Sequence, residues 1–302
     1  MTKCQKMIGV VMNKEFTPSN SIEQREKVQP LNKEKATVLI IERARQLVSQ
    51  LINKRGHNNP PFFSEEYAPL LEVKSIEKTD LRKVGGLLLR FPTGPKIKIN
   101  KNDPLVRQNF SCAHELGHLL FSELKLEQYV NNIEHRTFNP QVQQRKRAKA
   151  IEKLCDEVAT ELLMPTSIFQ KHLKELGTTI HSIERLAEMY KVSIQSAAIR
   201  ASEINKDTCM VLKWQFQKSP SKSIQLFWPK NKLVDKVLFS PVKNIVNPPS
   251  IFHEAYHCDD LVKGEISFKV GNQKKPKSFP AEIKSFGYGD NRYIISLVFF
   301  KG

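Results

Sequence analysis

The 302-residue chain has few cysteines, and they are scattered along it. The five cysteines include no C-x-x-C pair, which excludes a disulfide framework and fits a reducing compartment. No segment approaches the ~18 apolar residues of a membrane span, and the apolar run at Met7–Met12 is too short for a secretory signal. We therefore expect a soluble, cytoplasmic protein with no membrane partner.

Acidic residues are also in deficit. The chain holds 48 Lys and Arg against 31 Asp and Glu, a net charge of +17. The excess is densest in residues 206–302, which hold 16 basic and 8 acidic residues. Such charge suggests an anionic partner such as DNA, although a solvated lysine-rich surface is the commoner explanation. The apolar fraction of 40% is large enough to build cores, which excludes wholesale disorder.

The spacing of apolar residues predicts a chain of mixed α+β class, too long for one ordinary domain. Two strands are expected at Val84–Phe91 and Lys96–Asn100, and a hairpin at Glu282–Phe286 and Tyr293–Phe300. Helices are expected over residues 35–54, 103–124 and 142–164, with two shorter helices before residue 205.

The second of these helices contains an H-E-x-x-H pentapeptide, His114-Glu115-Leu116-Gly117-His118. Positions i and i+4 lie about 40° apart around a helix, so both imidazoles can bind one metal ion. Glu115 lies beside that face, where a glutamate can take a proton from a metal-bound water. Because burying two His and a Glu in an apolar helix is costly, motif and context favour a zinc site over two core histidines.

A hydrolytic zinc needs a third protein ligand and an open fourth position. The metzincin motif is excluded, because positions 121 and 124 hold Phe and Leu where it needs Gly and His. The next helix offers Glu152 as a ligand and Asp156, four residues on, as a hydrogen-bond partner for a ligand histidine. Glu157 and Glu161 form a rival pair on the same helix, and spacing alone leaves both pairs open.

Two segments together resemble the ImmA/IrrE family of metallopeptidases. One is residues 107–121, RQNFSCAHELGHLLF, and the other is residues 152–165, EKLCDEVATELLMP. The family pattern for the second segment reads roughly E-x-x-A-[ND]-x-F-A-x-x-L-L-M-P. The resemblance therefore implies that Glu152 is the third zinc ligand and that Asp156 fills the Asn/Asp position.

The resemblance also implies a fold. It is a gluzincin-like peptidase of α+β class, with a small sheet, an active-site helix and a glutamate helix, over residues 31–165. A loosely ordered leader is expected at residues 1–30, a helix-turn-helix-like extension at 166–205, and a β-rich region of unknown role at 206–302.

The activity that the resemblance implies is that of a zinc-dependent endopeptidase. Family members cleave helix-turn-helix repressors of phage, mobile-element or stress regulons and thereby release transcription. The implied cofactor is Zn²⁺, held by His114, His118 and Glu152, with Glu115 as the catalytic base. The implied partner is thus a protein substrate, and nucleic acid is not favoured.

Cys155 and Val158 depart from the Ala and Phe of the family pattern. Cys112 and Cys155 also flank the expected ligands in sequence, so control of the site by a thiol is conceivable. We expect both cysteines to be buried small hydrophobic residues instead.

A second H-E-x-x-H pentapeptide occurs at His253-Glu254-Ala255-Tyr256-His257. Its flanks form no long apolar helix, and no helix with a Glu-x-x-x-Asp pattern follows it. We expect a coincidence or a solvated helix here, with His253 and His257 as the alternative second metal site.

Residues 179–202 resemble a helix-turn-helix. A reading helix presents several polar or basic side chains to base edges, whereas this one offers Gln195, Arg200 and little else. A structural helix pair is therefore favoured. The alternative function is a DNA-binding or sensor protein with a structural zinc and no proteolysis.

Overall fold

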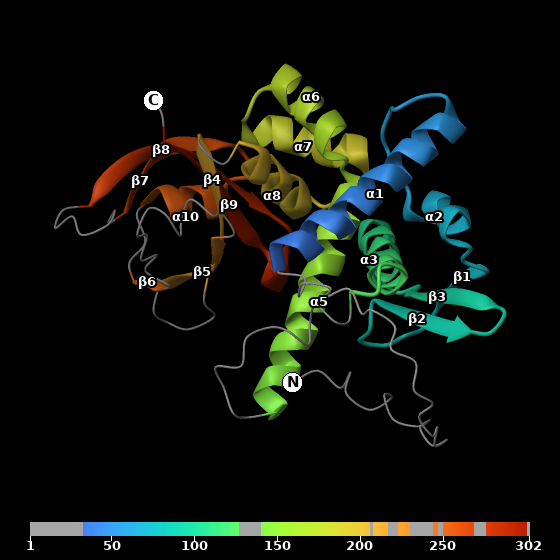
Figure 1. Cartoon of the computed structure of the whole chain (residues 1–302). Coiled ribbons are helices and arrows are strands. Elements are labelled where there is room, and N and C mark those ends of the chain that lie inside the picture. Colours follow the sequence, from blue (N-terminus) through green and yellow to red (C-terminus); the bar gives the residue numbers. More distant parts are fainter. Residues whose placement is uncertain are drawn as a thin grey trace. The chain divides into compact units, whose positions relative to one another are not determined.

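The computed structural model describes residues 33–126, 140–205, 208–216, 223–229, 244–246, 250–268 and 276–300 (Figure 1). Residues 31–302 form one compact unit. The expected leader at residues 1–30 lies outside the described residues.

The first sheet has three strands, β1 (Ser75–Thr79), β2 (Gly86–Phe91) and β3 (Gly94–Asn100). Their order is β1-β3-β2, with β1 parallel and β2 antiparallel to β3. The expected pair of strands is confirmed as β2 and β3. The sequence did not predict β1, because its pattern SIEKT has no strong alternation and the strand is held by its pairing with β3.

Helices precede and follow this sheet in the chain. They are α1 (Lys33–Arg55), the short α2 (Ser64–Tyr67), the 3-10 turn η1 (Ala68–Leu71), α3 (Leu105–Glu123) and α5 (Pro140–Leu163). Pro104 caps the N-terminus of α3 with an extended backbone, so the helix begins directly after it. The predicted helices over residues 35–54, 103–124 and 142–164 are thus confirmed to within a few residues.

Helix α3 packs directly on α5 and lies next to β2 (Figure 1). The two helices meet closely at Gly117, where a Cβ atom would lie 2.9 Å from the Cα of Cys155. A side chain at 117 would therefore push the helices apart. This close approach brings the side chains of α5 up to the H-E-x-x-H face of α3.

Three shorter helices follow α5: α6 (Thr166–Leu176), α7 (Ile180–Tyr190) and α8 (Ile194–Ile204). The hydroxyls of Thr179 and Ser193 cap α7 and α8 by accepting backbone N–H groups of the first turn. Both helices contribute buried residues to the same apolar core as α1, α3 and α5.

The second sheet has six strands in the order β6-β5-β4-β9-β8-β7, and every neighbouring pair is antiparallel. The strands are β4 (Cys209–Phe216), β5 (Ser223–Pro229), β6 (Asn244–Val246), β7 (Val262–Phe268), β8 (Lys277–Phe286) and β9 (Tyr293–Phe299). Helix α10 (Ser250–His257) and the 3-10 turn η2 (Gly289–Asn291) complete the region. The expected C-terminal hairpin is confirmed as β8 and β9, which pair from Phe286 opposite Tyr293.

The alternation of side chains along β4 and β9 divides this sheet between two cores. On β4, Val211 belongs to the core shared with α7 and α8, whereas its neighbour Leu212 belongs to a second core beneath α10. Polar contacts also hold the face of the sheet that packs on α7 and α8. The Glu282 carboxylate accepts the N–H of Ile180 at the start of α7 at 2.8 Å, and Lys284 pairs with Glu184 at 2.7 Å.

Candidate metal centre

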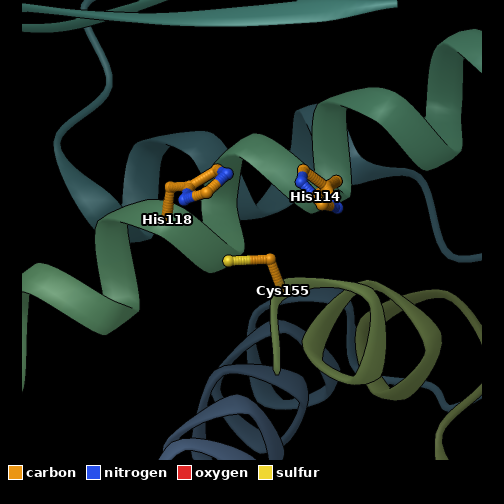
Figure 2. A group of neighbouring side chains, drawn as sticks. All are labelled: His114, His118 and Cys155. Atoms are coloured by element: carbon orange, nitrogen blue, oxygen red, sulfur yellow. The ribbon is translucent and has the colours of Figure 1, made fainter. Parts of the chain in front are cut away.

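Helix α3 presents its two histidines on one face. The imidazole rings of His114 and His118 lie with centroids 5.0 Å apart at 75° to each other (Figure 2). Residues around them are deeply buried, including Ala113, Leu116 and Leu120, which anchors this part of the helix. The one-turn spacing therefore brings two metal-binding nitrogens together on a fixed support.

Helix α5 supplies the carboxylates that face these rings. The Glu152 carboxylate lies 3.2 Å from Nε2 of His114 and 3.7 Å from Nε2 of His118. One turn further on, Oδ1 of Asp156 lies 3.0 Å from Nδ1 of His114. The structure thus brings the four residues His114, His118, Glu152 and Asp156 together.

The rival pair on α5 points elsewhere. Glu161 is buried and forms a salt bridge with Arg200 at 2.6 Å, while the Thr166 hydroxyl donates to it at 2.6 Å. Glu157 pairs with Lys153 of its own helix at 3.6 Å. Neither carboxylate is paired with a histidine of α3, so of the two alternatives only Glu152 and Asp156 face the motif.

A cysteine also reaches the centre. The Sγ of Cys155 and one nitrogen each of His114 and His118 lie within 4.8 Å of one another (Figure 2). Two candidates for a third ligand therefore exist, Cys155 and Glu152. Glu152 is the better supported, because one carboxylate lies within 3.7 Å of both Nε2 atoms and carries charge at neutral pH. The sequence contained a signal for Cys155, since position i+3 from Glu152 lies on nearly the same helix face.

Burial and neighbouring charged groups both shift the pKa values of the residues in this centre. Burial alone would lower the pKa of His114, but its hydrogen bonds to Asp156 and Glu152 outweigh this effect and raise the pKa to about 9. Burial lowers the pKa of His118, and the neighbouring His114 adds to the effect. The hydrogen bond to His114 lowers the pKa of Glu152, so this carboxylate is ionised.

Glu115 lies on the side of α3 that faces the first sheet. Burial raises its pKa to about 7, although the backbone N–H of Leu88 in β2 donates a hydrogen bond to it. Gly86 of the same strand is close as well, since a Cβ atom there would lie 2.9 Å from Oε1 of Glu115. Glycine at 86 therefore leaves room for this carboxylate beside β2.

This donor set fits a divalent transition metal. Two imidazoles and a carboxylate from two helices are ligands of the kind that bind catalytic zinc, and Asp156 orients His114 through its other ring nitrogen. A proton held between Glu152 and His114 would be displaced by such an ion.

The second H-E-x-x-H motif forms helix α10. Phe252 and Ala255 are buried against the sheet, whereas Glu254 and His257 are exposed. The His257 ring packs edge-on against its neighbour Tyr256. In the described part of the chain, the His114–His118–Cys155 group is the one cluster with metal-ligand spacing, and neither histidine of α10 joins such a cluster.

The two polar residues that the second helix of the helix-turn-helix-like segment offers for base reading, Arg200 and Gln195, already have partners within the protein. Arg200 of α8 is only 8% exposed and also donates to the backbone carbonyl of Met164. The side-chain oxygen of Gln195 accepts a hydrogen bond from the Lys213 ammonium of β4 at 3.0 Å. Neither side chain points freely into solvent, as reading of DNA bases would require.

Comparisons with known proteins agree with this geometry. Residues 75–202 match the model of the peptidase M78 family, described as the IrrE N-terminal-like domain. A solved structure described as a Mycobacterium tuberculosis transcriptional regulator superposes with a TM-score of 0.54 at 13% identity, covering 88% of this chain and 93% of that one. None of the curated proteins matches the sequence. Within the described residues, no helix has both the length and the apolar character of a membrane span.

Proposed function

Because residues 75–202 belong to the IrrE N-terminal-like peptidase family, we propose that the protein is a zinc-dependent endopeptidase. The observation that carries the proposal is the convergence of His114, His118 and Glu152, with Glu115 beside them. Zinc, when bound there, supplies a Lewis acid that polarises the scissile carbonyl and makes water more acidic.

Glu115 is the residue proposed to move the proton. It is 9% exposed and lies beside β2 next to the two histidines, where its carboxylate can accept a proton from the attacking water and return it. Asp156 does not touch the substrate in this proposal. It holds His114 with Nδ1 toward itself, so that Nε2 is directed at the metal.

The substrate peptide is proposed to bind along β2. Among the described strands it pairs with β3 alone, at the edge of its sheet, and it passes beside Glu115 at Gly86 and Leu88. An extended peptide can pair with the free edge of such a strand through its backbone. Its scissile bond would then lie close to both Glu115 and the histidines.

We propose that the substrate is a helix-turn-helix transcriptional repressor, cleaved to derepress a phage, mobile-element or stress regulon. The support is the ImmA/IrrE resemblance of residues 107–121 and 152–165, together with a solved neighbour that is described as a transcriptional regulator. The substrate would be a protein, and zinc the cofactor.

The test is cleavage by the purified full-length protein of a candidate repressor, chosen as the product of a neighbouring gene. Glu115→Gln should lower the cleavage rate by about 10²–10⁴-fold, because the general base is lost while its shape is kept. The matched control is Glu157→Gln on the surface of α5, which should cleave at the wild-type rate. Equal rates for the wild type and Glu115→Gln would reject Glu115 as the base.

A DNA-binding regulator with a structural zinc is the second candidate, favoured by a structural neighbour that is described as a transcriptional regulator and by the net charge of +17. It predicts tight DNA binding that weakens steeply with salt and survives Glu115→Gln. The engagement of Arg200 with Glu161 and of Gln195 with Lys213 argues against it.

A further inference from the structure

Cys155 occupies an unusual place for a free thiol. Its side chain is fully buried, one turn after Glu152 and directly before Asp156 on α5. Figure 2 shows its sulfur directed toward α3, alongside the two imidazoles. Its Sγ and a nitrogen of each histidine form a group whose members all lie within 4.8 Å of one another.

The packing of the two helices fixes this position. A Cβ atom on Gly117 would lie 2.9 Å from the Cα and 3.1 Å from the Cβ of Cys155, so backbone lies against backbone at this point. The Cβ atom of Cys155 is therefore held at the crossing of the two helices. A small displacement of the side chains, without movement of the helices, would bring Sγ and the two nitrogens to the spacing of ligands around one ion.

We propose that Cys155 is a further ligand of the metal, and that His114, His118, Glu152 and Cys155 together close the centre in the resting protein. Thiolate sulfur and imidazole nitrogen are both favoured ligands of zinc. On binding, the sulfur forms a bond to the ion, its proton passes to solvent, and no group is oxidised or reduced. Four protein ligands fill a tetrahedral site, so a substrate gains access only when Cys155 is released.

The second half of this inference, a closed site that opens, rests on the proposed peptidase function. The first half, the sulfur ligand, does not. It concerns a position where the resembling family has Ala, so Cys155 is a property of this chain rather than of the shared motif.

Cobalt substitution tests the ligand directly in the full-length protein. Thiolate bound to Co²⁺ gives an intense near-ultraviolet charge-transfer absorption that imidazole and carboxylate ligands do not give. We expect this band at one equivalent of Co²⁺ in the wild type and its loss in Cys155→Ala. Cys112→Ala is the matched control, because Cys112 is a buried thiol on α3 two residues before His114, and its variant should keep the band.

A competition titration with a chelator gives a second measure. Cys155→Ala should bind Zn²⁺ about ten-fold or more weakly than the wild type, since a direct ligand is worth at least as much as an outer-shell partner. If Cys155→Ala does not fold, Cys155→Ser keeps the volume of the side chain and should also lose the band. A wild-type cobalt protein that binds one equivalent without the band overturns the proposal.

Cleavage assays separate this inference from the proposed function. If the site is closed by Cys155, the cleavage rate of Cys155→Ala at saturating zinc should exceed that of the wild type. A rate equal to or below the wild-type rate overturns the closed state. If the cobalt protein shows the thiolate band but neither the wild type nor Cys155→Ala cleaves the repressor, the peptidase function is rejected and Cys155 remains a metal ligand. If the repressor is cleaved in a Glu115-dependent way but the band is missing, the peptidase function stands and Cys155 is rejected as a ligand.

Discussion

The chain carries the same pentapeptide twice, in helices α3 and α10, and only one copy is surrounded by further metal-binding side chains. Helix α3 runs for 19 residues through an apolar core, and α5 packs along it with Glu152, Cys155 and Asp156 toward its histidines. Helix α10 has 8 residues and packs on a sheet through Phe252 and Ala255.

The pentapeptide therefore places two imidazoles side by side but does not by itself form a metal centre. What α10 lacks, within the described residues, is a second helix whose side chains meet its histidines. On α3 that role depends on α5, whose far end is anchored by Glu161 and Arg200. Substitutions at the histidines, at the Glu161–Arg200 pair, at Asp156 and at Gly117 test this difference between α3 and α10.

The largest effect is expected at the histidines. The wild type should retain one equivalent of zinc after dialysis, His114→Ala should retain almost none, and His253→Ala should retain the full equivalent, because only α3 has ligands from a second helix. Metal analysis of the three proteins measures this. Two equivalents in the wild type, with one lost in His253→Ala, would show that α10 also holds a metal.

The next effect concerns the anchor of α5. Glu161→Gln removes the closer charged partner of the buried Arg200 guanidinium, leaves it with Glu203 at 3.8 Å, and should lower the free energy of unfolding by up to about 3–5 kcal/mol. Denaturant unfolding at neutral pH measures it, and Glu157→Gln is the control on the same helix. A loss below 1 kcal/mol would show that the anchor is dispensable.

The same pair predicts a dependence on pH. Burial alone would raise the pKa of Glu161, but Arg200 and the hydrogen bonds from Thr166 hold it below its ordinary value of 4.5. The stabilisation is therefore complete above about pH 4.5 and is lost as the pH falls through the lowered pKa. The gap in stability between the wild type and Glu161→Gln should narrow below pH 4.5. A constant gap would contradict this assignment.

A smaller effect is expected at Asp156, which contacts Nδ1 of His114 and would act on a bound metal only through that ring. Asp156→Ala should weaken zinc binding by about 10–100-fold, because the imidazole loses the partner that orients it. Competition with a chelator measures the affinity, and Asp156→Asn should recover part of it through a neutral hydrogen bond. Unchanged affinity in Asp156→Ala would remove Asp156 from the site.

The smallest effect is expected at the crossing of the helices. Gly117→Ala places a methyl group against the backbone of Cys155 and should cost about 1–3 kcal/mol of stability. Gly264→Ala, on β7 beneath α10, meets only the end of the flexible Ile251 side chain and should cost less. Thermal unfolding of the two variants compares the packing of the two motifs. Equal losses would contradict the distinction.

Much of the centre could be predicted from the sequence because helical spacing alone determines it. The pairs His114 and His118, and Glu152 and Asp156, are each four residues apart, so each pair faces one way. The meeting of the two faces required the family resemblance, since spacing left Glu157 and Glu161 open.

The rest depended on tertiary packing. Helical spacing places Cys155 on nearly the same face of α5 as Glu152. Its approach to the histidines depends on the closeness of α3 and α5 at Gly117, which spacing within one helix does not encode. Strand β1 was not predicted for a similar reason, because its pairing with β3 compensates for a weak local pattern. The role of Arg200 was equally hidden, since a basic residue on a short helix is usually solvated.

The divided sheet sets a limit on how this protein can be shortened. Because alternate residues of β4 and β9 belong to different cores, a chain ended at residue 205 would expose the apolar side of α7 and α8 to water. The shortened chain would also lack Glu282, whose carboxylate accepts the backbone N–H of Ile180 at the start of α7. A loss of cleavage on truncation would therefore report the uncovering of that surface. Point substitutions on the outer face of the sheet are the sounder test of whether the sheet binds a partner.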